Sequence, residues 1–160
     1  MEAHQQIELL RRQSLRITVY LVAATLTTLF LGYFLLAFPG RMIFFLAVAL
    51  IGFSGSGVAA LTSCLDRYAR GFELSDGSKE PKEAKGETFN SRMARWFYVR
   101  PFLGFVVAPV CLWGIEFLAK TSDTLRDSPE HLAFTAFLSG LLAKSVIDLI
   151  KNLFKNVFHS

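Results

Sequence analysis

Residues 131–158 read HLAFTAFLSGLLAKSVIDLIKNLFKNVF, and this stretch indicates the class of the protein. Its first half, residues 132–143, carries no charge. The second half has charged residues four, three and four positions apart, namely Lys144, Asp148, Lys151 and Lys155. At about 100° per residue they fall within roughly 60° of a helix surface. The stretch predicts one helix that begins as a membrane span and ends as an amphipathic rod at the membrane surface.

Long apolar runs separated by charged segments make up the rest of the chain. Of the 160 residues, 52% are hydrophobic, and the mean hydropathy is +0.41. About 20 apolar residues cross the roughly 30 Å hydrocarbon core of a bilayer. We therefore expect an all-α membrane protein, one domain over residues 1–160, with four transmembrane helices in two antiparallel hairpins. The expected spans are residues 17–38, 42–64, 102–119 and 132–150.

Three polar segments flank these runs. Residues 1–16 mix leucine and isoleucine with polar residues, which predicts an amphipathic helix on the inner membrane surface leading into the first span. Residues 73–88 are rich in Lys, Glu, Gly and Ser and have almost nothing to bury, so we expect a flexible cytoplasmic loop. Residues 89–100 combine arginine with Trp96 and Tyr98. The combination also fits an RNA-binding surface, but the adjacent span favours the lipid headgroup zone, and we expect no nucleic-acid partner despite the net charge of +4.

The distribution of Lys and Arg predicts the orientation in the membrane. Three precede the first span and eight lie between the second and third, whereas the two remaining loops carry one and two. Basic loops stay on the cytoplasmic side. We therefore expect an integral protein of the inner membrane, of bacterial type, with both termini in the cytoplasm and the last helix extending there.

Small residues recur at four-residue spacing within the predicted spans. One column in the second span contains Gly52, Ser56 and Ala60, and the third span contains Gly104 and Ala108. Such columns let helices approach closely, so we interpret these five residues as helix-packing positions. The glycine-rich run at residues 52–57 also resembles a phosphate-binding loop, but it lacks the Lys-Ser/Thr that such a loop requires.

No catalytic or metal-binding pattern is evident in the sequence. The three His and two Cys are scattered, and no recognised spacing of metal ligands or nucleophile and base occurs. We expect no enzymatic activity, no cofactor and no metal. Glu116 is the one acidic residue of the third run, and it either reaches the outer interface or faces an ion path.

The charged stripe of the last helix suggests a function. Continued backwards, its face passes through Gly140 and Phe137. An oligomer with these helices around an axis would place rings of Lys144, Asp148 and Lys151 below an apolar neck, as in a gated channel. The leading hypothesis is a homo-oligomeric ion channel or pore. The alternatives are a solvated helix face on a non-conducting scaffold that docks a cytoplasmic protein, or a transporter, for which no internal repeat is evident.

Two short stretches resemble segments of small bacterial membrane proteins. They are residues 100–104, reading RPFLG, and residues 137–140, reading FLSG. The resemblance implies no activity, and we transfer no residue role from it.

Overall fold

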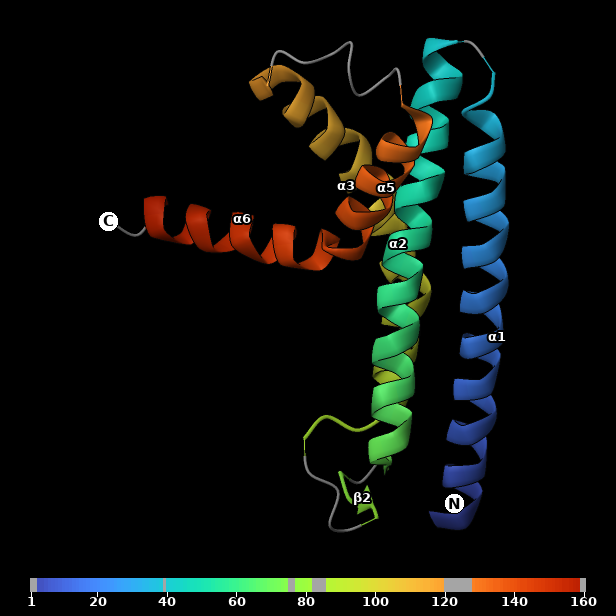
Figure 1. Ribbon diagram of the computed structural model, residues 1–160. Helices are drawn as coiled ribbons and strands as arrows, with labels where there is room; N and C mark the ends of the chain where they lie inside the picture. Colours follow the sequence, from blue (N-terminus) through green and yellow to red (C-terminus); the bar gives the residue numbers. More distant parts are fainter. Residues whose placement is uncertain (1–2, 39, 75–76, 82–85, 120–127, 159–160) are drawn as a thin grey trace.

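The computed structural model describes residues 3–38, 40–74, 77–81, 86–119 and 128–158. This part of the chain forms five helices and one small antiparallel sheet (Figure 1). The helices are α1 (Ala3–Leu35), α2 (Arg41–Arg70), α3 (Ser91–Ala119), α5 (Pro129–Leu141) and α6 (Ala143–Phe158). The strands are β1 (Phe72–Glu73) and β2 (Lys79–Glu80). The prediction of an all-α architecture is therefore confirmed, apart from this two-residue pairing.

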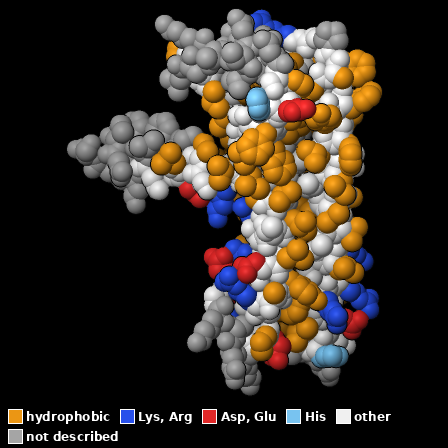
Figure 2. Space-filling model, viewed as in Figure 1, with side chains coloured by type: hydrophobic (Ala, Val, Ile, Leu, Met, Phe, Trp, Pro, Cys, Tyr) orange, Lys and Arg blue, Asp and Glu red, His pale blue; other side chains and the backbone are white. Residues whose placement is uncertain are grey.

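Three helices, α1, α2 and α3, are long and apolar enough to cross a membrane. The pair formed by α5 and α6 passes the same test only when both are taken together, and the pair is bent by 59°. The described part of the chain accordingly has three helices that could span a membrane, or four candidate spans if the bent pair is one span. Figure 2 shows hydrophobic side chains over much of the visible bundle, with charged side chains gathered towards the end that holds the N-terminus.

The first helix differs from the expectation of a surface segment followed by a span. It runs without a break from Ala3 to Leu35 (Figure 1). It contains no proline, and its one glycine, Gly32, lies within the helix without breaking it. Leu10 and Ile17 are buried in one shared cluster, so the polar part of α1 packs along the bundle as part of the same helix. The prediction of a separate surface helix is therefore wrong.

Helix α2 is the centre of the bundle. It packs against α1, α3 and α5 (Figure 1), and all seven residues from 51 to 57 are buried. A helix buried on every side needs small residues wherever a neighbour approaches closely, and this run reads IGFSGSG. The helix ends at Gly71, whose φ of +113° lies in a region that favours glycine.

Helix α3 begins earlier than the predicted span. The side-chain oxygen of Asn90 accepts a hydrogen bond of 2.9 Å from the backbone N–H of Met93, which caps the helix start. Residues 91–100 are thus the first turns of α3. Pro109 lies inside the helix and removes the hydrogen bond to the carbonyl of Phe105. Figure 1 shows the last turns of α3 leaning away from α2.

The segment predicted to be a flexible loop folds back on the helix ends where it is described. Strand β1 pairs with β2, with Phe72 opposite Glu80. Leu74, Thr88 and Phe89 are buried. The expectation that this tract buries almost nothing is wrong for Leu74 and Thr88, while its flexibility stays a prediction, and residues 75–76 and 82–85 lie outside the described residues.

The apolar cluster that buries Leu10 and Ile17 lies beside these strands. It contains Leu10, Ile17, Leu21, Ala60, Cys64, Phe89, Ala94 and Phe97. The rings of Phe89 and Phe97 stack with centroids 6.3 Å apart and an interplanar angle of 3°.

We call the described residues of 3–16, 66–74, 77–81 and 86–100 the polar end of the bundle. The cluster holds the polar end to the remainder of α1 and α2.

The sequence predicted one continuous last helix, and this prediction is wrong. Helix α5 ends at Leu141, Leu142 has φ −89° and ψ 1°, and α6 leaves the bundle sideways (Figure 1). Two forces favour the bend. Gly140 is pressed against α2, which fixes α5, and a helix with one polar and one apolar face is best accommodated along a membrane surface. The C-terminal helix is therefore a lateral arm, and its expected extension into the cytoplasm stays a prediction.

Candidate functional site

The closest approach in the bundle lies where α2, α3 and α5 meet. Gly52 and Ser56 of α2 face Gly104 of α3, and Gly140 of α5 lies on the backbone of Gly52. A Cβ atom added to Gly104 or to Gly140 would come closer than 3.0 Å to the carbonyl oxygen of Gly52. We call Gly52, Gly55, Ser56, Gly104, Ala108 and Gly140 the glycine junction.

The remaining members of the junction fill its sides. Ala108 is fully buried, and a Cβ on Gly52 would collide with its methyl group. A Cβ atom added to Gly55 would likewise collide with the carbonyl oxygen of Phe137. The structure thus brings together Gly52, Ser56, Gly104 and Ala108. It places Ala60 elsewhere, in the apolar cluster with Ile17 and Leu21.

Polar side chains cross the same region, and of these the sequence analysis singled out only Ser56, as a helix-packing position. The hydroxyls of Thr28 in α1 and Ser54 in α2 are 2.8 Å apart. Ser56 donates a hydrogen bond of 2.8 Å to the carbonyl oxygen of Arg100, whose guanidinium donates one of 2.7 Å to Ser63. The available signal was an arginine directly before Pro101 at the start of a span, opposite a span rich in serine.

The residues proposed to line a pore are divided by the bend. Phe137 and Gly140 lie on α5 against α2, whereas Lys144 and Asp148 are exposed on α6 beyond it. Within the described part of the chain, neither Lys144 nor Asp148 forms an ion pair. The side chains of Glu116 and Lys151 lie outside the described part of the structure, so their roles stay predictions.

Groups able to bind a metal do not converge in the part of the chain that the structure describes. No set of three His, Cys, Asp or Glu side chains gathers there. Cys64 is buried and Cys111 is half-buried, and both are free thiols. The geometry provides close helix packing and polar anchoring within the bundle.

No family model, curated protein sequence or solved structure matches the chain. The function must therefore be argued from the geometry itself. Two surfaces remain for it: the lateral arm α6, and the polar end with its own apolar cluster.

Proposed function

We propose that the protein is a non-conducting membrane scaffold that holds the polar end at the inner membrane surface for a cytoplasmic protein partner. The observation that carries the proposal is that the polar end is folded. All three long helices contribute to it, and Phe89 and Phe97 are both buried there. A loop that merely connects two spans does not need an apolar cluster of its own.

The polar end also offers a groove of suitable kind. A cavity of about 720 Å³ opens between α1 and the segment around β1. Leu9 and Leu10 contribute apolar surface, whereas Gln13, Glu73 and Arg92 contribute polar groups. Leu9 is 55% exposed, so its side chain is accessible from the groove. This mixture suits a peptide segment that presents apolar side chains between hydrogen-bonding groups.

The glycine junction argues against a pore within one copy. Helices α2, α3 and α5 are in backbone contact there, and no space remains even for a Cβ atom at Gly140. Conduction would therefore need several copies around an axis. One observation supports an oligomeric channel as the second candidate function. Lys144 and Asp148 are exposed on an arm that points away from the bundle, where another copy is able to contact them.

Two measurements on the purified protein separate the candidates. The oligomeric state is determined in mild detergent, and ion conductance is measured after reconstitution into a planar bilayer. A scaffold predicts a monomer or dimer without conductance. A ring of four or more copies with reproducible currents would favour the channel.

A position-specific crosslinker tests the docking surface directly. A photoreactive amino acid at Leu9 places the probe in the groove, and one at the exposed Arg95 on α3 serves as the control outside it. We expect a discrete crosslinked product in cells from position 9 and none from position 95. Equal labelling from both positions would contradict the groove as the docking surface.

A further inference from the structure

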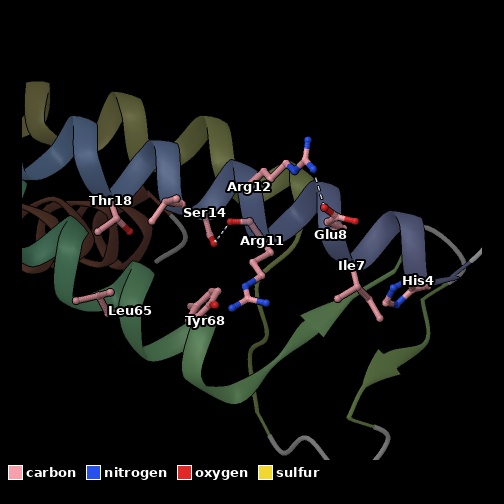
Figure 3. Close-up of a pocket in the computed structure, with 10 residues that line it drawn as sticks. His4, Ile7, Glu8, Arg11, Arg12, Ser14, Thr18, Leu65 and Tyr68 are labelled. Carbon is pink, nitrogen blue, oxygen red and sulfur yellow. Dashed lines mark hydrogen bonds and ion pairs between the residues drawn. The ribbon is translucent and has the colours of Figure 1, made fainter.

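A second groove runs between α1 and α2 at the membrane boundary of the polar end (Figure 3). Its volume is about 680 Å³, within the range of small-molecule sites. Ile7, Arg11, Leu15 and Thr18 line it from α1, and Leu65 and Tyr68 line it from α2. Spacings of four and three residues place the α1 residues on one face of that helix.

The lining changes character along the groove. Leu15, Thr18 and Leu65 form the end nearer the spans, and the two leucines are 65% and 46% exposed. Arg11 and His4 lie further towards the N-terminus. The distance along the helix from Thr18 to Arg11 is about 10 Å at 1.5 Å per residue. The groove is therefore apolar at one end and cationic at the other.

For a bilayer whose hydrocarbon layer begins where the apolar run of α1 begins, this change falls at the depth of the lipid headgroups. The apolar run of α1 starts after Arg16, and Arg11 lies about 7.5 Å further along the helix. The headgroup layer on each side of a bilayer is about 5–8 Å thick. The guanidinium of Arg11 consequently falls at the level of the lipid phosphates, while Leu15 and Leu65 reach the upper ends of the acyl chains.

The two neighbouring arginines of α1 differ in their surroundings. Arg12 forms an ion pair of 2.6 Å with Glu8, so those two charges cancel. The guanidinium of Arg11 has no ion-pair or hydrogen-bond partner among the residues that the structure describes, and Figure 3 shows it reaching across the groove towards Tyr68. Tyr68 is held in place by an edge contact with Phe72, with ring centroids 5.5 Å apart.

We propose that this groove binds one anionic phospholipid of the inner leaflet. The Arg11 guanidinium donates hydrogen bonds to the phosphate, and the Tyr68 hydroxyl donates another. Leu15 and Leu65 contact the first methylene groups of the acyl chains. Because Glu8 is neutralised by Arg12, the groove keeps a net positive charge, which favours a headgroup without an ammonium group. The proposal is independent of the scaffold function, since a channel would hold this lipid equally well.

The test compares two variants that lose the same charge. Native mass spectrometry is recorded on the full chain in micelles containing phosphatidylglycerol or phosphatidylcholine, for the parent, Arg11→Gln and Arg95→Gln. We expect the parent to retain one phosphatidylglycerol per chain in preference to phosphatidylcholine. Arg11→Gln should bind it roughly tenfold more weakly, because a charge-assisted hydrogen bond is lost, whereas Arg95→Gln, outside the groove, should keep the preference.

Each alternative result overturns the proposal. Equal losses in both variants would mean that general surface charge attracts the lipid. No preference in the parent would mean that the groove does not select a headgroup. A competition with free glycerol 1-phosphate distinguishes the source of the phosphate. If this soluble compound displaces the lipid at millimolar concentration, the groove binds a soluble phosphate.

Discussion

The side-chain hydroxyl of Ser56 donates a hydrogen bond of 2.8 Å to the backbone carbonyl oxygen of Arg100. The guanidinium of the same arginine donates to Ser63, seven residues further along α2. One residue of α3 is therefore attached to α2 at two points about 10 Å apart along the helix axis. The pair fixes both the height and the rotation of α3 against α2, directly beside Gly104.

Removing the guanidinium should weaken this attachment. We expect Arg100→Met to lower the free energy of unfolding by about 1–2 kcal/mol, because the hydrogen bond to Ser63 is lost while the chain length is retained. Reversible unfolding in mixed detergent micelles measures the change. Arg95→Met, on the exposed face of α3, should have little effect. If Ser63→Ala and Arg100→Met act additively, the two side chains are not coupled.

Replacing small residues of the glycine junction by leucine should disrupt the bundle. Gly52→Leu or Ser56→Leu should cost about 1–3 kcal/mol or more and should lower the yield of monodisperse protein, because neighbouring backbones leave no room. Leu50→Ala should do less, since Leu50 is only half-buried. Thermal unfolding followed by size-exclusion chromatography measures both effects. Unchanged folding in the two leucine variants would contradict close packing at this junction.

Two glycine-to-alanine substitutions provide a matched control. A Cβ atom at Gly140 would collide with the backbone of Gly52, whereas a Cβ at Gly114 would meet no atom within 4 Å. We expect Gly140→Ala to destabilise the protein. Gly114→Ala should be neutral or should stabilise α3 by roughly 0.5–1 kcal/mol, because alanine loses less backbone entropy on folding.

The long helices were predictable because their signal is local. An apolar run as long as residues 17–38 is typical of a membrane span. The four-residue spacing of Gly52 and Ser56 predicts that small residues share one face of a helix. Which neighbour each small residue meets depends on tertiary packing. Ala60 continues the same column in sequence, yet it packs in the polar-end cluster with Ile17.

The break at Leu142 had no local signal, since neither glycine nor proline occupies that position. It arises because Gly140 is held by α2 while the next turn carries Lys144 and Asp148 on one side. The continuity of α1 was missed because its local sequence pattern indicated a different structure. Its polar segment resembles a surface helix until the burial of Leu10 against other elements is known.

The orientation predicted from the basic residues is testable by cysteine labelling. Cys64 and Cys111 are first replaced by serine, and a cysteine is then introduced as Glu80→Cys or Thr124→Cys. In intact cells we expect a membrane-impermeant maleimide to label position 124 and to leave position 80 unlabelled, because eight basic residues keep residues 65–100 inside. The opposite pattern would reverse the topology.

The apolar cluster of the polar end should control its resistance to proteolysis. Phe89→Ala should open this part and speed cleavage by trypsin between residues 79 and 92, because truncating a buried phenylalanine costs about 3–5 kcal/mol. Phe30→Ala is the control, since that side chain is 73% exposed on α1. Cleavage is followed by mass spectrometry of the fragments. Equal rates in both variants would mean that the cluster does not stabilise the polar end.

The charged positions of α6 distinguish a solvated helix face from an interface between copies. For a solvated face, Asp148→Asn and Lys144→Asn should each change stability by less than about 0.5 kcal/mol and should leave the oligomeric state unchanged. Conductance and oligomer size are measured for the two variants, the double variant and the parent. If Asp148→Asn alters assembly and the double variant restores it, the two residues face partners in another copy, and the channel gains support.

The central place of α2 has a consequence for how the chain is made. Gly52 emerges from the ribosome about 90 residues before Gly140, the residue that finally covers it. At about 5–20 residues per second, that interval lasts roughly 4–18 s. During this time the buried strip of α2 faces lipid without α5. A chain that stops before residue 129 lacks α5 and never covers the strip. Translation speed therefore sets how long the strip of each nascent chain is exposed to non-native helix contacts.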